Sequence, residues 1–205
     1  MVPVNDKPLI QYTLEWLRAS GVEDVILLCG YRAEKLMEYF GDGASLGLRI
    51  HYSIEEKPLG RGGAFKKGFS LVPPGEEFVI GANGDNFYAH NLPEMIDYHR
   101  SKAAAVSVLL VQLRSPYGIA TVGDEGTITG FVEKPLLPHW LNAGFYLISA
   151  DAFPLFPDVG DHEESTFPLL ASRGRLFGFK SEAPWRAVDT VKDLMEVGKE
   201  LRERA

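Results

Sequence analysis

The alternation of short apolar runs with amphipathic stretches is the feature that most constrains how this chain folds. In the first hundred residues, apolar runs predict strands at 25–30, 48–53 and 77–82. Helical spacing or a glycine turn predicts helices before, between and after them: 8–19, 33–40, 60–69 and a stretch marked by Leu92, Met95, Ile96 and His99. This β-α-β-α-β order predicts an α/β fold with a parallel, doubly wound sheet.

The pattern changes after residue 103. Strands with short connections are then predicted, with no long helices between them: 104–113, 118–122, 128–133 and 142–149. Helices return near 163–173 and 190–204. We therefore expect one domain over residues 1–205, in which 1–103 form a nucleotide-binding half and 104–205 add mostly antiparallel strands.

Composition limits the partners that this chain can have. Its formal net charge of −7 and its lack of a Lys/Arg run argue against nucleic acid. No apolar run approaches the roughly 20 residues of a membrane span, and the N-terminus does not resemble a secretory signal. Cys29, the only cysteine, lies in an apolar run and is expected to be buried and structural, which fits the reducing cytoplasm.

The stretch FVIGANGDNF, residues 78–87, places an acid directly after a buried-looking strand and two glycines. Ligands of open parallel sheets sit beyond the carboxyl ends of the strands. Asp85 lies at such an end, and Gly84 would let a ligand approach the backbone closely. A carboxylate there suits Mg²⁺. A turn aspartate that caps the next helix explains Asp85 equally well.

Two further stretches have both a functional and a structural interpretation. In EEKPLGRGGAFKKG (55–68), Pro58 and Gly60 precede a helix whose backbone N–H groups could face an anion or a base. An ordinary capped loop would look the same. In FVEKP (131–135), Glu133 and Lys134 stand side by side at a strand end, as they also would in a solvated hairpin.

Together and in this order, the segments resemble the sugar-1-phosphate nucleotidyltransferases, also called NDP-sugar pyrophosphorylases. The matching segments run through nearly the whole chain: PVNDKPLIQYTLEWL, GVEDVILLCGYRAEKLMEYFGDG, EEKPLGRGGAF, NGDN, YGIATVGDEGTITGFVEKP, LNAGFYLIS and WRAVDTVKDL. The resemblance implies a Rossmann-like mixed sheet with helices on both faces and an antiparallel sugar-binding insertion. It also implies an Mg²⁺-dependent reaction of an NTP with a sugar 1-phosphate, giving NDP-sugar and pyrophosphate.

The resemblance assigns roles by matching motifs. Asp85 matches a metal ligand, Gly84 a backbone position near the nucleoside, and Lys134 a contact to the sugar phosphate; Asp85 and Lys134 are therefore the expected catalytic residues. The other expected contacts are to the base, from Glu55, Pro58 and Gly60, and to the sugar, from Tyr117, Gly118, Glu133, Asn142 and Gly144.

The second metal ligand departs from the family pattern. The family has an Asp in Trp-x-Asp-x-Gly-Thr, and this chain has Ala187 at that position and Asp189 two residues later. A two-residue shift along a strand keeps the same face, displaced by roughly 7 Å, so Asp189 is the expected replacement. Asp189 could instead cap the last helix. The W-x-x-x-D-T form looks like the cytidylyltransferase branch, while the base and the sugar stay open.

The family's first strand and its glycine-rich triphosphate loop are not found in this sequence. By resemblance the strand lies near the middle of the sheet, and Met1 matches an internal Met of a longer Lys-Pro-Met-Val-Pro-Val segment. We therefore expect a chain of marginal stability and incomplete catalysis. The alternative function is a non-catalytic, nucleotide-sugar-binding or regulatory relative, and a homo-oligomer is possible.

Overall fold

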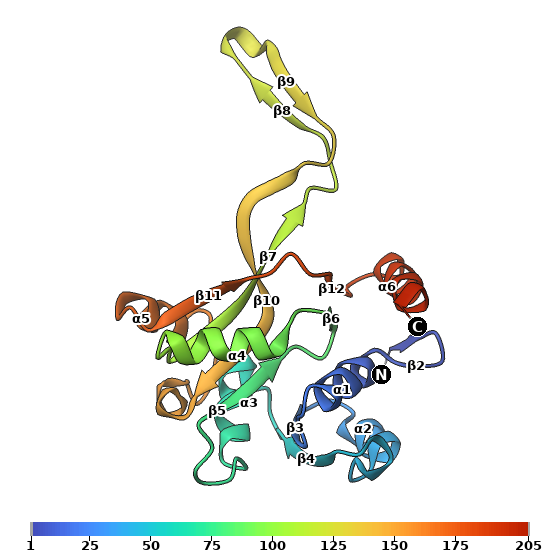
Figure 1. The fold of residues 1–205 in the computed structure, drawn as a ribbon, viewed down its shortest axis with the longest axis vertical. Coiled ribbons are helices and arrows are strands. Elements are labelled where there is room, and N and C mark those ends of the chain that lie inside the picture. The colour runs from blue at the N-terminus through green and yellow to red at the C-terminus, as the bar shows by residue number, and fades with distance from the viewer. Residues whose placement is uncertain (1, 205) are drawn as a thin grey trace.

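The computed structural model describes residues 2–204 and shows a mixed α/β fold with a long hairpin projecting from a rounded body (Figure 1). The helices are α1 (Leu9–Ala19), α2 (Ala33–Phe40), α3 (Gly60–Phe69), α4 (Leu92–Ser101), α5 (Thr166–Ser172) and α6 (Val191–Arg204). The strands are β1 (Pro3–Val4), β2 (Lys7–Pro8), β3 (Asp24–Cys29), β4 (Arg49–Ile54), β5 (Phe78–Ala82), β6 (Asn86–Tyr88), β7 (Val106–Arg114), β8 (Ile119–Val122), β9 (Ile128–Val132), β10 (Leu136–Ser149), β11 (Leu176–Lys180) and β12 (Trp185–Ala187).

The main sheet has four strands in the order β11-β7-β10-β5. β10 is antiparallel to both of its neighbours, and β11 is parallel to β7. Side chains alternate between the two faces of a strand, so Phe145 and Leu147 enter one apolar cluster while Tyr146 and Ile148 enter the other. The strand β10 therefore lies at the centre of the core.

The strands β3 and β4 form a separate parallel pair. The same helix, α1, packs on both sheets: Leu14 joins the cluster of the small sheet and Leu17 that of the large one. The helix α3 also packs on both sheets. Its Gly68 lies against Leu28 of β3, and its Phe65 lies against Gly81 of β5. The predicted α/β class with a mixed sheet is confirmed. Among the described residues β3 and β5 are not paired with each other.

Two short strand pairs complete the fold. β6 pairs with β12, and β8 pairs with β9 in the projecting hairpin. The sequence did not predict β6, because a run of three residues carries too little periodicity. Nor did it predict β11, whose glycine at position 178 interrupts a five-residue run. A strand through Ala187 and Asp189 was assumed in placing the second metal ligand, but β12 ends at Ala187. The four-stranded sheet contains strands from both sides of residue 103, where the two halves were expected to meet, because β5 pairs with β10.

The structure also bears on the single cysteine and on whether a helix could span a membrane. Cys29 is buried and free, as expected, and burial raises the pKa of its thiol. Among residues 2–204 no helix combines the length and apolar character needed to cross a membrane.

Candidate active site

A bulge in β10 forms the centre of the candidate site. The register against β7 shifts between Asn142 and Tyr146, where Gly144 takes a left-handed φ of 69°. The Asn142 Oδ1 atom accepts a hydrogen bond from the Gly144 N–H (2.9 Å), and its Nδ2 donates to the Tyr146 hydroxyl (2.9 Å). The side chain of Asn142 is thus fixed in direction while the residue stays exposed.

The loop around Asp85 is tied to this bulge by backbone and side-chain bonds. The Asn83 N–H donates to the Gly144 carbonyl (2.8 Å), and the Asn86 Nδ2 donates to the Ala143 carbonyl (2.9 Å). A Cβ on Gly144 would lie only 2.4 Å from the Asn83 Nδ2, so glycine is required on steric as well as conformational grounds. The Trp185 Nε1 also donates to the Ala143 carbonyl (2.9 Å), which brings β12 to the same place.

The two predicted metal ligands lie at one end of the β6–β12 pair. The Val188 N–H donates to the Asp85 carbonyl (3.0 Å), so Asp85 and Asp189 are one position apart in register. Adjacent strands are about 4.8 Å apart. Both aspartates fall just outside the regular ladder, which begins at Asn86 and ends at Ala187, so strand alternation does not fix their side-chain directions.

The helix-capping role considered for Asp189 belongs to its neighbours. Thr190 and Asp193 cap α6 reciprocally, with Thr190 N–H donating to the Asp193 Oδ2 (2.9 Å) and Asp193 N–H to the Thr190 Oγ1 (3.2 Å). The Thr190 hydroxyl holds the pKa of the Asp193 carboxyl below its usual range. In the part of the chain that the structure describes, no hydrogen bond or ion pair engages the exposed carboxylates of Asp85 and Asp189.

These two carboxylates fit a hard divalent cation. Mg²⁺ usually takes one or two protein carboxylates and completes its shell with phosphate oxygens and water. Among residues 2–204 no three His, Cys, Asp or Glu side chains gather as a metal cage.

The N-terminus of α3 differs from the expectation of free N–H groups. The Gly62 and Gly63 N–H groups donate to the Gly160 carbonyl (2.9 and 3.2 Å), and the Arg61 N–H donates to Asp161 Oδ1 (2.8 Å). Gly60 has a φ of 74°, and a Cβ there would lie 2.8 Å from the Gly160 backbone. The first turn is therefore capped by a later loop, so a base would have to meet the exposed residues of the loop before it, among them Pro58.

Glu55 closes that loop with one of its oxygens. Its Oε2 accepts the Leu59 N–H (3.1 Å), and its Oε1 lies so near Gly30 that a Cβ on Gly30 would be 2.8 Å away. Residue 55 thus sits at the carboxyl ends of β3 and β4. The Oε1 atom makes no hydrogen bond among the described residues and is the one free for a ligand.

The remaining predicted residues lie on the hairpin, which we call the arm (residues 115–135). A Cβ on Gly118 would be 2.8 Å from the Glu133 Oε2, so these two residues are adjacent. Tyr117 is 75% exposed, and Lys134 has a φ of 48°, uncommon for a residue with a side chain. No hydrogen bond or ion pair in the described chain joins this group to the β10 bulge.

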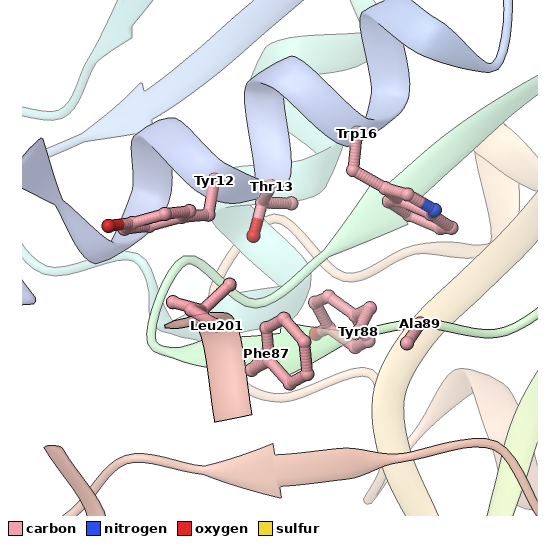
Figure 2. A pocket seen from close by; sticks show the side chains of 7 residues that line it. All are labelled: Tyr12, Thr13, Trp16, Phe87, Tyr88, Ala89 and Leu201. Atoms are coloured by element: carbon pink, nitrogen blue, oxygen red, sulfur yellow. The ribbon is translucent and has the colours of Figure 1, made fainter. Parts of the chain in front are cut away.

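A cavity beside this site contains none of the predicted residues. It encloses about 230 Å³ between α1, β6 and the end of α6 (Figure 2). Its lining is mostly aromatic: Tyr12, Thr13, Trp16, Phe87, Tyr88, Ala89 and Leu201. The Thr13 hydroxyl donates to the Asn86 carbonyl (3.4 Å), so this layer supports the loop of Asp85 from behind.

Sequence reasoning missed the residues that position the site. Asn83, Asn86, Tyr146 and Trp185 hold the bulge and the loop together, and all four stood in matched segments without being given a role. The signal that could have assigned the cap correctly was Thr190 followed three residues later by Asp193.

Comparison with known proteins gives a consistent family. A family model described as nucleotidyl transferase matches residues 1–204. The mannose-1-phosphate guanylyltransferase of Mycobacterium tuberculosis is 30% identical over 209 residues, covering 98% of this chain and 58% of that protein. The D-glycero-alpha-D-manno-heptose 1-phosphate guanylyltransferase of Campylobacter jejuni is 35% identical over 156 residues, covering 75% of this chain and 67% of that protein. This chain therefore spans little more than half the length of the first relative.

Solved structures support the same fold. HddC from Yersinia pseudotuberculosis superposes with a TM-score of 0.79 at 21% identity, covering 98% of this chain and 88% of that one. The same protein complexed with GMP-PN gives a TM-score of 0.77 at 20% identity, with the same coverage of both chains.

Proposed function

The chain belongs to the nucleotidyl transferase family, and we propose that it transfers a guanylyl group from GTP to a sugar 1-phosphate of the manno series. The observation that carries this proposal is the match along 98% of the chain to a mannose-1-phosphate guanylyltransferase. The similarity to a manno-heptose 1-phosphate guanylyltransferase points to the same base and sugar configuration.

The reaction needs positioning and charge neutralisation more than a protein nucleophile. A phosphate oxygen of the sugar 1-phosphate attacks the α-phosphorus of GTP, and the bond from that phosphorus to the bridging oxygen breaks. Pyrophosphate leaves in line. Asp85 and Asp189 would hold Mg²⁺, which when bound neutralises the phosphate charge in the transition state.

The protein's own residues would position the two substrates. Asn142, fixed by its bonds to Gly144 and Tyr146, presents its exposed side to sugar hydroxyls. Glu133 would accept hydrogen bonds from hydroxyls, and Lys134 would neutralise the sugar phosphate as a point charge. On the nucleotide side, the free Glu55 Oε1 suits the N1–H and amino group of guanine, which are both donors.

A pyrophosphate-release screen tests this function. GTP, CTP, UTP, dTTP and ATP are each offered with mannose 1-phosphate, manno-heptose 1-phosphate and glucose 1-phosphate in the presence of Mg²⁺. We expect release chiefly with GTP and a manno sugar. Preference for CTP would instead support the cytidylyl resemblance of the W-x-x-x-D-T stretch and reject guanine.

The same screen, combined with calorimetry, distinguishes a non-catalytic binding protein from an enzyme. A binding subunit would take up GDP-mannose but bind GTP poorly and release no pyrophosphate with any pair. The unengaged carboxylates of Asp85 and Asp189 favour the enzyme, because a binding-only protein has no need of exposed, unpaired acids at that point.

A further inference from the structure

The arm leaves its apolar side chains uncovered. It stands away from the body (Figure 1), closed at its base by the Ser115 N–H donating to the Pro135 carbonyl (2.9 Å). Every residue of β8 is exposed. The arm's large apolar side chains are between 45% and 63% exposed: Ile119, Val122, Ile128, Phe131 and Val132. A two-stranded hairpin is marginal in water by itself, so this surface calls for a covering partner.

One face of the arm is the more apolar. Phe131 is paired with Ala120, and Val122 with Ile128. Residues directly opposite each other in an antiparallel pair share a face, and so do residues two apart on one strand. Phe131 and Ile128 are three apart on β9, but the register shifts by one residue between them, so they lie opposite Ala120 and Val122, which share a face. Phe131, Val122 and Ile128 therefore make one apolar strip, which we call the arm strip. Its three members are each more than 60% exposed.

Charge is distributed unevenly along the arm. The tip carries Asp124 and Glu125, both exposed. The base carries Arg114 and Lys134, held together by the Arg114 Nη1 donating to the Lys134 carbonyl (3.0 Å). Glu133 beside them leaves the base with a net charge of one positive. The arm is thus negative at one end and positive at the other.

We propose that the arm strip binds the arm strip of a second copy of this chain, with the two arms antiparallel around a two-fold axis. In that arrangement each acidic tip meets the basic base of the other arm, so one surface is complementary to itself in shape and in charge. Such an isologous contact closes as a dimer. A parallel arrangement would oppose like charges at both ends. The contact is small, so the dimer should dissociate on dilution.

The oligomeric state of the full chain tests the proposal by sedimentation over a concentration series. We expect a monomer–dimer equilibrium that Ile128→Thr with Phe131→Thr weakens at least tenfold. The matched control is Tyr31→Ser with Val159→Thr, which removes two exposed apolar side chains from the body, 88% and 68% exposed. Circular dichroism checks that both variants are folded. A monomer at every concentration, or a dimer indifferent to the strip variant, would overturn the proposal.

A charge cycle tests the antiparallel orientation. Asp124→Lys with Glu125→Lys places positive tips against positive bases and should weaken the dimer about tenfold at low salt. Adding Arg114→Glu to that variant should recover most of the loss, because the new base then attracts the new tip. Tip variants that dimerise like the wild type would refute the antiparallel packing. Capture of some other protein by the strip, without self-association, would also count against it.

Discussion

The body and the arm hold their parts of the candidate site in contrasting ways. In the body, Asn142, Gly144 and the loop of Asp85 are fixed by a set of hydrogen bonds around the β10 bulge. In the arm, Tyr117, Glu133 and Lys134 lie on a hairpin with no buried strand residue. Lys134 and Asn142 are eight positions apart in the chain, a reach of at most about 26 Å along an extended chain.

This difference separates two tasks. Groups that orient a metal and a nucleotide gain from a rigid support, because misplacement by a fraction of an ångström costs rate. Groups that bind a sugar phosphate can lie on a segment that makes fewer packing contacts. We therefore expect substitutions in the body to affect folding and turnover, and substitutions in the arm to affect mainly substrate binding and association.

The largest expected effect compares two phenylalanines. Phe145 is fully buried in the main sheet, and Phe131 is 63% exposed on the arm. Phe145→Ala should lower the free energy of unfolding by about 3–5 kcal/mol, through lost burial and a cavity. Phe131→Ala should change it by less than about 0.5 kcal/mol. Denaturant unfolding in dilute solution, where the chain is monomeric, measures both; equal losses would mean that the arm is part of the core.

Acid should destabilise the body through two buried histidines. Burial lowers the pKa of His90 to about 4 and, with Arg61 adding to the effect, that of His162 to about 4. The unfolded chain takes up these protons below about pH 6.5, whereas the folded chain does not until about pH 4. The stabilisation is therefore complete above pH 6.5 and declines toward pH 4, by about 3 kcal/mol for each histidine.

Slopes of stability against pH test this expectation. Near pH 5, His90→Leu should make the slope shallower by up to about 1.4 kcal/mol per pH unit, the equivalent of one proton. His139→Leu removes an exposed histidine and serves as the matched control for the substitution itself. A His90→Leu slope identical to the wild type would show that His90 is solvated in the folded protein.

Removal of the Asp85 carboxylate should reduce turnover. Asp85→Ala should lower kcat by roughly 10²-fold, or about 2.7 kcal/mol, by removing a preorganised ligand for charge neutralisation. Asp97→Ala, on the exposed face of α4, is the matched control. Pyrophosphate release under saturating substrates measures the effect. A near-normal kcat would remove Asp85 from the metal site.

The smallest expected effect belongs to the arm. Lys134→Ala should raise the KM for the sugar 1-phosphate about tenfold, or about 1.4 kcal/mol, because one charge-assisted contact is lost. Affinity for GTP should be little affected, and Lys102→Ala on the body should alter neither. If only GTP affinity fell, Lys134 would belong to the nucleotide side and the division between body and arm would be wrong.

Local patterns in the sequence predicted the elements better than their pairing. The bounds of α2 and α3 agree with the prediction to the residue, because helical spacing and glycine turns are local signals. The separation of β3 from β5 was not visible in the strands themselves, since pairing depends on which edges meet.

The site shows the same division. Asp85 and Asn142 could be named from motifs of a few residues. The bond of Trp185 to Ala143 joins positions 42 apart, and no local pattern indicates it. The cap on α3 was missed for a similar reason, because its acceptors come from residues 160 and 161. Contacts of this kind are decided by tertiary packing.

That cap has a consequence for synthesis on the ribosome. The Arg61 N–H finds its acceptor 100 positions later in the chain, at Asp161. The first turn of α3 therefore stays without its partners until residue 161 has left the exit tunnel, and β5 likewise waits for β10. The N-terminal half is made first but is completed late, so a nascent chain halted before residue 160 should remain sensitive to protease at α3 and β5.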